Sequence, residues 1–154
     1  MSNSNDFQQF MDVLQHFDHV MLVTDRGGRL RSRPMVIGDV TDDGRIRFIT
    51  SDDSAKLDEL TEHAQVNVSA QGEQRFLSIS GNARLSKDDD LVEAAWQRHQ
   101  SVWFAEGRDD PHVIAIEVIP EYGEYWDRSE GNLITRVFGA SEAHGEVDFR
   151  GKPV

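Results

Sequence analysis

The chain contains no cysteine, which excludes disulfide bonds, iron–sulfur clusters and thiol catalysis and fits a reducing cytoplasm. Basic residues are also few: 16 Lys and Arg stand against 28 Asp and Glu, which leaves a net charge of −12. Binding to nucleic acid or to an anionic membrane surface relies on Lys and Arg, so this balance argues against both. Apolar runs fall short of the roughly 18 residues of a transmembrane helix, and the N-terminus lacks the features of a signal peptide. We therefore expect a cytoplasmic protein.

The length of 154 residues is that of a single domain, and the 38% of hydrophobic residues is enough to form a core. We expect residues 1–136 to form that domain. Beyond Arg136 the sequence is polar and contains glycine, so residues 137–154 are expected to be a poorly ordered tail.

Hydrophobic spacing predicts three helices and six or seven short strands. An opening amphipathic helix is indicated by Phe7, Phe10, Met11, Leu14 and Phe17. Two further helices are expected at residues 54–63 and 87–98. Strands joined mostly by hairpin turns are expected at residues 19–24, 29–40, 45–50, 65–70, 75–85, 113–119 and 122–127. The absence of regular βαβ alternation favours a mainly β fold, a small antiparallel barrel with helices packed outside it or across its mouth.

Several familiar kinds of catalytic or binding site are missing. The pair Gly27-Gly28 falls in a predicted hairpin turn and not between a strand and a helix, so it is not a phosphate-binding loop. The six histidines have no zinc-ligand spacing, and we expect no metal site. No Gly-x-Ser-x-Gly nucleophile motif is present, which argues against a serine hydrolase.

One segment has the residues of an anion-binding site. A predicted strand ends at Thr50, and Ser51, Ser54 and Lys56 follow where a helix is expected to begin. Hydroxyl groups, free N–H groups at a helix start and a lysine can together bind a phosphate. The alternative is a capped helix, with a side chain of residues 51–53 as the cap and the lysine in solvent. Residue chemistry alone favours the cap.

Two other features suggest a ligand or an interface. Pro34 inside a predicted strand places residues 31–35 at a sheet edge or bulge, where backbone groups are free to meet a ligand, although a plain edge strand explains it equally well. Trp103 and Phe104 are expected in a loop and Trp126 at a strand end. Such aromatic residues stack on planar ligands, fill oligomer interfaces or, most often, fill a core.

Taken together and in order, these features resemble the general stress proteins of the pyridoxamine 5′-phosphate oxidase-like superfamily, which are FMN-binding split barrels. The resemblance covers residues 6–130. It rests on residues 28–35, Ile46 to Ser51, Ser54-Ala55-Lys56, Val66-Asn67-Val68, Gly81, Trp103-Phe104, Asp109-Asp110-Pro111 and Tyr125-Trp126.

The resemblance implies a six- to seven-stranded antiparallel split β-barrel that forms a homodimer, with one FMN in each groove between the subunits. By position, the residues expected to contact the flavin ring, its ribityl chain or its phosphate are Arg33, Pro34, Met35, Val36, Ile49, Thr50, Ser51, Ser54, Lys56, Trp103 and Trp126. Ser54 and Lys56 would hold the phosphate, and the tryptophans would approach the ring system, Trp126 or Trp103 from the partner subunit.

The sequence also departs from true pyridoxamine phosphate oxidases. Gly38 stands where those enzymes have a substrate-binding lysine, Ala55 replaces an arginine of the phosphate segment, and Phe76 replaces a glutamine near the flavin. No Arg and His motif for the substrate follows Trp126. The resemblance therefore implies that this chain is not a vitamin B6 enzyme.

The leading hypothesis is an FMN-binding general stress protein that, if catalytic, is a flavin-dependent oxidoreductase with an unidentified electron donor. Alternatives are a flavin-binding protein without turnover, a structural dimer that has lost its flavin, and a split barrel that uses F420 or haem. Haem would need His99 or His112 as its axial ligand.

Overall fold

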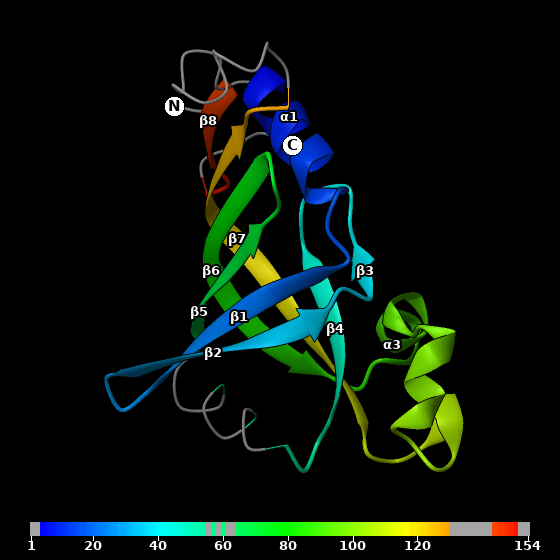
Figure 1. Ribbon diagram of the computed structural model, residues 1–154. Coiled ribbons are helices and arrows are strands. Elements are labelled where there is room, and N and C mark those ends of the chain that lie inside the picture. The colour runs from blue at the N-terminus through cyan, green and yellow to red at the C-terminus, as the bar shows by residue number, and fades with distance from the viewer. Residues whose placement is uncertain (1–3, 55–56, 58–59, 61–63, 130–142, 151–154) are drawn as a thin grey trace.

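The computed structural model describes residues 4–54, 57, 60, 64–129 and 143–150 (Figure 1). Within them, eight strands form one antiparallel sheet in the order β2-β1-β5-β6-β7-β4-β3, with β8 paired to β7. The predicted mainly β, antiparallel fold is confirmed. The elements are α1 (Ser4–Leu14), β1 (His19–Arg26), β2 (Arg29–Val36), β3 (Asp39–Val40), β4 (Ile46–Ser51), β5 (Gln65–Gln71), β6 (Arg75–Ser86), α3 (Asp89–Ala95), the 3₁₀ helices η1 (Arg98–Val102) and η2 (Gly107–Asp109), β7 (Val113–Asp127) and β8 (Ala143–Asp148).

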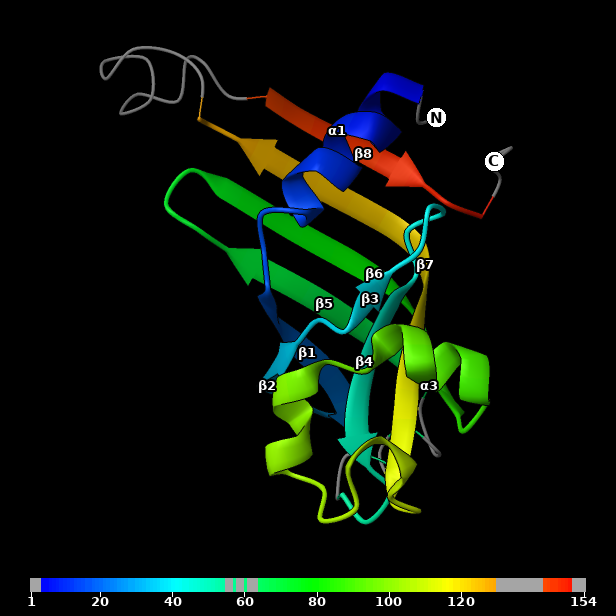
Figure 2. The same cartoon turned by 90° about the vertical axis from the view of Figure 1, so that its right-hand side faces the viewer.

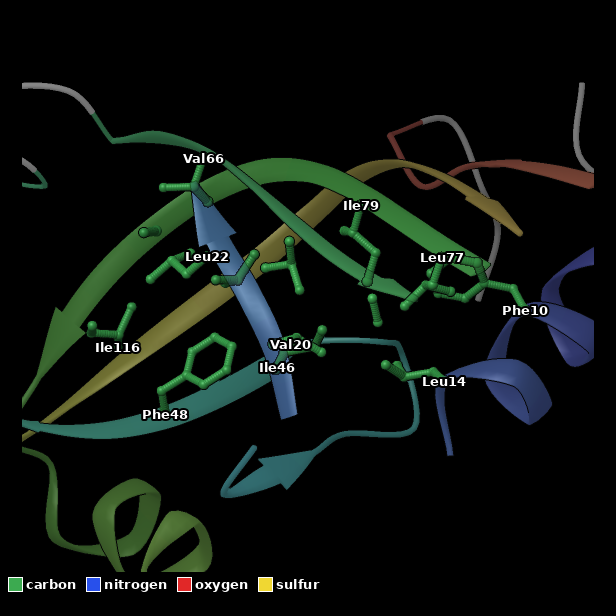
Figure 3. Close-up of a cluster of buried hydrophobic side chains, with 14 of the residues drawn as sticks. Phe10, Leu14, Val20, Leu22, Ile46, Phe48, Val66, Leu77, Ile79 and Ile116 are labelled. Atoms are coloured by element: carbon green, nitrogen blue, oxygen red, sulfur yellow. The ribbon is translucent and has the colours of Figure 1, made fainter. Parts of the chain in front are cut away.

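The sheet curls around a hydrophobic core. Strands β1, β5 and β6 alternate buried and partly exposed residues, so one face of each carries the apolar side chains that fill this core. Residues from six strands meet inside, part of which is seen in Figure 3. The fully buried strand residues among them are Leu22, Ile46, Phe48, Val68, Ile79, Ile116, Val118 and Val147. This is the interior of a small barrel, filled by side chains.

Helix α1 packs against β6, β7 and β8 and lies across β7 and β8 in Figure 2. Its residues Phe10 and Leu14 are at most 1% exposed and point into the core (Figure 3). The buried Tyr125 of β7 ties the helix to the sheet, because its hydroxyl donates to Gln9 Oε1 at 2.6 Å and contacts Asp6 Oδ1 at 3.1 Å.

Strand β7 is continuous, although two separate strands were expected, one on each side of Pro120. Proline lacks the N–H group that a ladder requires, so it is tolerated in a sheet mainly at edges and bulges. Here the register of the β6–β7 pairing shifts between Ser80 and Gly81, and Gly81 lies opposite Pro120. A Cβ atom at Gly81 would lie 2.1 Å from the carbonyl oxygen of Ile119, so the bulge requires glycine.

The strand expected over residues 29–40 is interrupted at Gly38. A Cβ atom at this position would lie 2.2 Å from the carbonyl oxygen of Ala95, so helix α3 packs directly on the backbone. The Gly38 N–H donates to Arg47 O at 2.9 Å, and Gly38 O accepts from Gln97 Nε2 at 2.7 Å. Gly38 therefore joins the barrel to the segment that carries α3 and η1.

The expected tail is partly wrong, because residues 143–148 form strand β8. This strand pairs with β7 from Tyr122↔Asp148 to Asp127↔Ala143. Val147 is fully buried, and the ring of Phe149 packs edge-on against that of Phe10 at 5.6 Å. A polar segment is ordered here because its few apolar residues reach the core beside helix α1. The rest of the expected tail lies outside the described residues.

The two other expected helices agree only in part with the described structure. The helix expected over residues 87–98 ends earlier, as α3, and is followed by η1. Most of the helix expected over residues 54–63 lies outside the described residues, although Leu57 and Leu60 are helical and buried. Among the described residues, no helix is long and apolar enough to cross a membrane.

Glu117 of β7 is a charged residue with a fully buried side chain. Its carboxylate accepts from Arg47 Nε at 2.9 Å and from Arg84 Nη2 at 2.5 Å, and Arg45 Nη1 lies 3.4 Å away. Burial would raise the pKa of this carboxyl, but the hydrogen bonds from Arg47 and Arg84 outweigh it and hold the pKa below its usual range. Glu117 thus links β7 to β4 through Arg47 and to β6 through Arg84.

Candidate functional site

A cavity of about 550 Å³ lies between the end of β2, the end of β4 and η1, and we call it the β4 cavity. Three stretches that are far apart in the sequence meet there. Its walls are formed by Pro34, Met35, Val36, Ile49, Thr50, Ser51, Asp53, Ser54, Gln100, Trp103 and Phe104. Most of the residues expected to bind a cofactor are therefore brought together.

The β4 wall is held by strand pairing. Thr50 pairs with Ile114 and Ser51 with Val113 of β7, so the end of β4 is fixed where it borders the cavity. Thr50 is 9% exposed. Immediately after the strand, the Ser54 N–H donates to Ser51 O at 3.1 Å and closes a turn. This turn brings three neighbouring residues that carry hydroxyl groups to the wall of the same cavity.

The opposite wall comes from η1 and the residues after it. The Gln100 side chain is buried and accepts from the Gln97 N–H at 2.7 Å, which caps the 3₁₀ helix. Phe104 is buried against Trp96, with ring centroids 5.7 Å apart. Trp103, in contrast, is 79% exposed although it lines the cavity. The wall thus combines anchored side chains with one large aromatic surface that the chain itself leaves open.

The acidic residues beside the cavity have different partners. Asp53 lies in the wall and accepts from the Ser51 hydroxyl at 2.5 Å. Asp52 accepts from Lys87 Nζ at 2.7 Å and lies 2.9 Å from His112 Nδ1. Hydrogen bonds from Lys87 and then His112 hold the pKa of the Asp52 carboxyl below its usual range. The same hydrogen bond to Asp52 raises the pKa of the His112 imidazole.

Two of the expected cofactor residues are not in the cavity wall, and a third lies outside the described residues. Arg33 turns toward β1, where Nη2 donates to Thr24 Oγ1 at 2.7 Å. Trp126 lies near the opposite end of β7 and stacks on His144, with ring centroids 5.3 Å apart and planes 13° apart. Lys56, together with Ala55, lies outside the described residues.

Three wall residues were not expected from the sequence. Phe104 directly follows Trp103 in the expected loop, and this neighbouring position was the feature of the sequence that could have indicated it. Asp53 was expected only as one of the possible helix caps, at residues 51–53. Gln100 gave no signal, because the 3₁₀ helix that buries it was not expected.

Comparison with known proteins identifies the family. The model of the family described as pyridoxamine 5′-phosphate oxidase like matches residues 5–147. The chain is 26% identical over 126 residues to general stress protein 26 of Bacillus subtilis, across 79% of this chain and 88% of that protein. It is 30% identical over 161 residues to protein bli-3 of Neurospora crassa, across 97% of this chain and 74% of that protein.

A solved structure agrees with the sequence comparisons. The general stress FMN/FAD binding protein of Xanthomonas citri superposes with a TM-score of 0.72 at 25% identity, across 85% of this chain and 94% of that chain. The curled antiparallel sheet is the split barrel expected from the resemblance. The chain therefore belongs to the pyridoxamine 5′-phosphate oxidase-like family.

Proposed function

We propose that the chain binds FMN in the β4 cavity, as a homodimer in which the partner subunit completes each site. The observation that carries the proposal is the convergence of residues 34–36, the end of β4 and Trp103 on one cavity. Its volume of about 550 Å³ lies within the roughly 300–1,000 Å³ of small-molecule sites. The relative from Xanthomonas citri, named as an FMN/FAD binding protein, supports a flavin as the ligand.

The described walls fit the two halves of such a molecule. Met35, Ile49 and Trp103 provide apolar and aromatic surface for the planar ring system. Thr50 and Ser54 provide hydroxyl groups for a ribityl chain and a phosphate. The bound flavin would supply the redox chemistry, and the protein would position it and exclude water from one of its faces.

The phosphate is the least well matched part of the ligand. Among the wall residues that the structure describes there is no lysine or arginine, and Asp53 is acidic. The cation expected from the sequence is Lys56. We expect Lys56→Ala to weaken FMN binding by about 1.5–3 kcal/mol, the contribution of a charge-assisted hydrogen bond, and to leave riboflavin binding unchanged. An equal loss for both ligands would contradict this assignment.

The homodimer is supported by exposed apolar side chains beside the cavity. Val102 is 80% exposed and Trp103 is 79% exposed, and large neighbouring apolar side chains in solvent are typical of interaction sites. A partner subunit that covers them would also close the cavity over the flavin. We expect light scattering to give twice the chain mass with or without added FMN.

The test of the cofactor is direct. The purified protein is examined by absorbance, incubated with FMN and passed through gel filtration, and the Kd is measured by flavin fluorescence. We expect FMN to co-elute with the protein and Trp103→Ala to weaken binding at least tenfold, about 1.4 kcal/mol. The matched control is Leu30→Ala, because Leu30 in the β1–β2 hairpin is an apolar residue that is 72% exposed, close to the exposure of Trp103. The proposal would be overturned if the protein does not bind FMN, or if Trp103→Ala and Leu30→Ala lose the same amount of FMN affinity.

A flavin-binding role without turnover is the second candidate. Among the described wall residues, Asp53 is the one titratable side chain, and its carboxylate already accepts from the Ser51 hydroxyl. His112, considered above as a haem ligand, is hydrogen bonded to Asp52 and is not a wall residue. Steady oxidation of NAD(P)H by the holoprotein would favour an oxidoreductase, and its absence would favour flavin binding alone.

A further inference from the structure

Strands β7 and β8 bring together three side chains that bind metal ions, although histidine spacing in the sequence predicted no metal site. The ligating atoms of Glu124, His144 and Glu146 all lie within 4.8 Å of one another. Glu124 and Glu146 are paired across the two strands, and His144 is two residues before Glu146, on the same face of β8. We call these residues the β8 cluster.

The geometry of the β8 cluster suits a small divalent ion. His144 Nε2 lies 3.3 Å from Glu124 Oε2. Two ligands each about 2.0–2.1 Å from a tetrahedral zinc ion are separated by about 3.3–3.4 Å. This contact is also a hydrogen-bond distance, but the histidine and one carboxylate thereby have the spacing of two ligands of one ion, and the Glu146 carboxylate lies within 4.8 Å of both.

The charges of the cluster also call for a cation. Glu124 and Glu146 are directly opposite in the β7–β8 ladder, and like charges in this position destabilise a strand pair. No lysine or arginine among the described residues forms an ion pair with either of them. A divalent ion bound between the carboxylates would convert this repulsion into attraction.

Neighbouring side chains hold the ligands in place. The His144 ring stacks on Trp126, which restricts its rotation, and leaves Nε2 directed toward Glu124. The Tyr122 side chain lies beside Glu146, because Tyr122 pairs with Asp148 two residues further along β8 and lines the same pocket as Glu146. Partners of this kind, which orient the ligands themselves, are typical of metal sites.

We propose that the β8 cluster binds one divalent transition-metal ion, of the zinc type, through Glu124, His144 and Glu146. One imidazole and two carboxylates suit such an ion better than Ca²⁺ or Mg²⁺, which prefer oxygen ligands alone. The cluster lies on the far half of β7 from the β4 cavity, whose β4 wall pairs with the start of that strand (Figure 1). The ion would fasten β8 to β7, and it plays no part in the flavin binding proposed above.

The test is a calorimetric titration of the full chain with ZnCl₂ after treatment with a chelator. We expect one Zn²⁺ per chain with a micromolar Kd, and affinities for Ca²⁺ and Mg²⁺ at least tenfold weaker. His144→Ala and Glu146→Gln should each weaken Zn²⁺ binding at least tenfold. The matched control is Asp148→Asn, which removes one charge from the same strand outside the cluster, and it should change the Kd less than threefold.

A second measurement separates binding from folding. Because a ligand that binds only the folded protein stabilises it, Zn²⁺ should raise the melting temperature of the parent protein and of Asp148→Asn, but not of His144→Ala. Circular dichroism without metal should be the same for all of them. Zn²⁺ binding that is equally tight in His144→Ala and the parent protein, or equally weakened by Asp148→Asn and Glu146→Gln, would overturn the proposal.

Discussion

Replacement of the buried carboxylate of Glu117 by an amide tests whether the arginine cluster stabilises the barrel. Glu117→Gln keeps the shape of the side chain but removes the charge that faces three arginines. Removal of one partner from a buried ion pair costs about 3–5 kcal/mol. Arg45 and Arg84 are 35% and 55% exposed and can regain water, whereas Arg47 is only 19% exposed. We therefore expect the lower end, a loss of about 3 kcal/mol in the free energy of unfolding.

Urea denaturation measures this loss. With an m-value of about 2 kcal/mol/M, the midpoint should fall by about 1.5 M without a change in m. Glu93→Gln is the control, because Glu93 is 72% exposed and its pair with Arg108 should contribute at most about 1 kcal/mol. If Glu117→Gln lowers the free energy of unfolding no more than Glu93→Gln does, the ion pairs of Glu117 with Arg45, Arg47 and Arg84 do not stabilise the fold.

The same carboxylate has a predictable dependence on pH. Its pKa in the folded state is lower than its ordinary value of 4.5, because the arginine hydrogen bonds outweigh burial. Stability from Glu117 is therefore fully present above pH 4.5 and is lost as the pH falls through the folded-state pKa. The parent protein should lose stability in that acidic range, and Glu117→Gln should lose less over the same range.

Three further changes test other contacts. Gly38→Ala should lower the free energy of unfolding by about 1–3 kcal/mol, because the new methyl group meets the backbone of Ala95, and unchanged urea unfolding would refute this contact. Tyr125→Phe removes a buried hydroxyl that holds helix α1 and should cost about 1 kcal/mol in the same assay, whereas no loss would show that the hydroxyl contributes nothing. In an NMR titration, His112 should have a pKa above 6.5 that falls toward this value in Asp52→Asn, and an identical titration in both proteins would contradict the pair.

The mainly β fold was predictable because strands such as β1, β5 and β6 alternate buried and partly exposed residues. Where the expectations differ from the structure, contacts distant in the sequence outweigh local preferences. A strand was expected to end before Pro120, but the bulge at Gly81 accommodates this proline within β7. In β8, polar residues alternate with Gly145 and Val147, so only one large apolar side chain marked a strand that pairs with the edge of β7.

Part of the candidate site was also predictable, because some of its residues lie on regular strands. The cavity residues of β2 and β4 lie on regular elements, and their order along the chain carried the family resemblance. Gln100 could not be expected, because its burial depends on a 3₁₀ helix held by Gln97 and Gly38. The β8 cluster could not be expected either, since only the register of β7 and β8 places Glu124 beside His144.

The contact between helix α1 and strand β8 has a consequence for the order in which the protein can fold during synthesis. The helix is translated before the strands on which it packs, and Val147 and Phe149, part of the surface beside Phe10, follow it by more than 130 residues. Until then one apolar side of α1 is uncovered, although the strands between can already pair. The nascent barrel therefore passes through a stage with exposed apolar surface, when contact with another chain or a chaperone is most favoured.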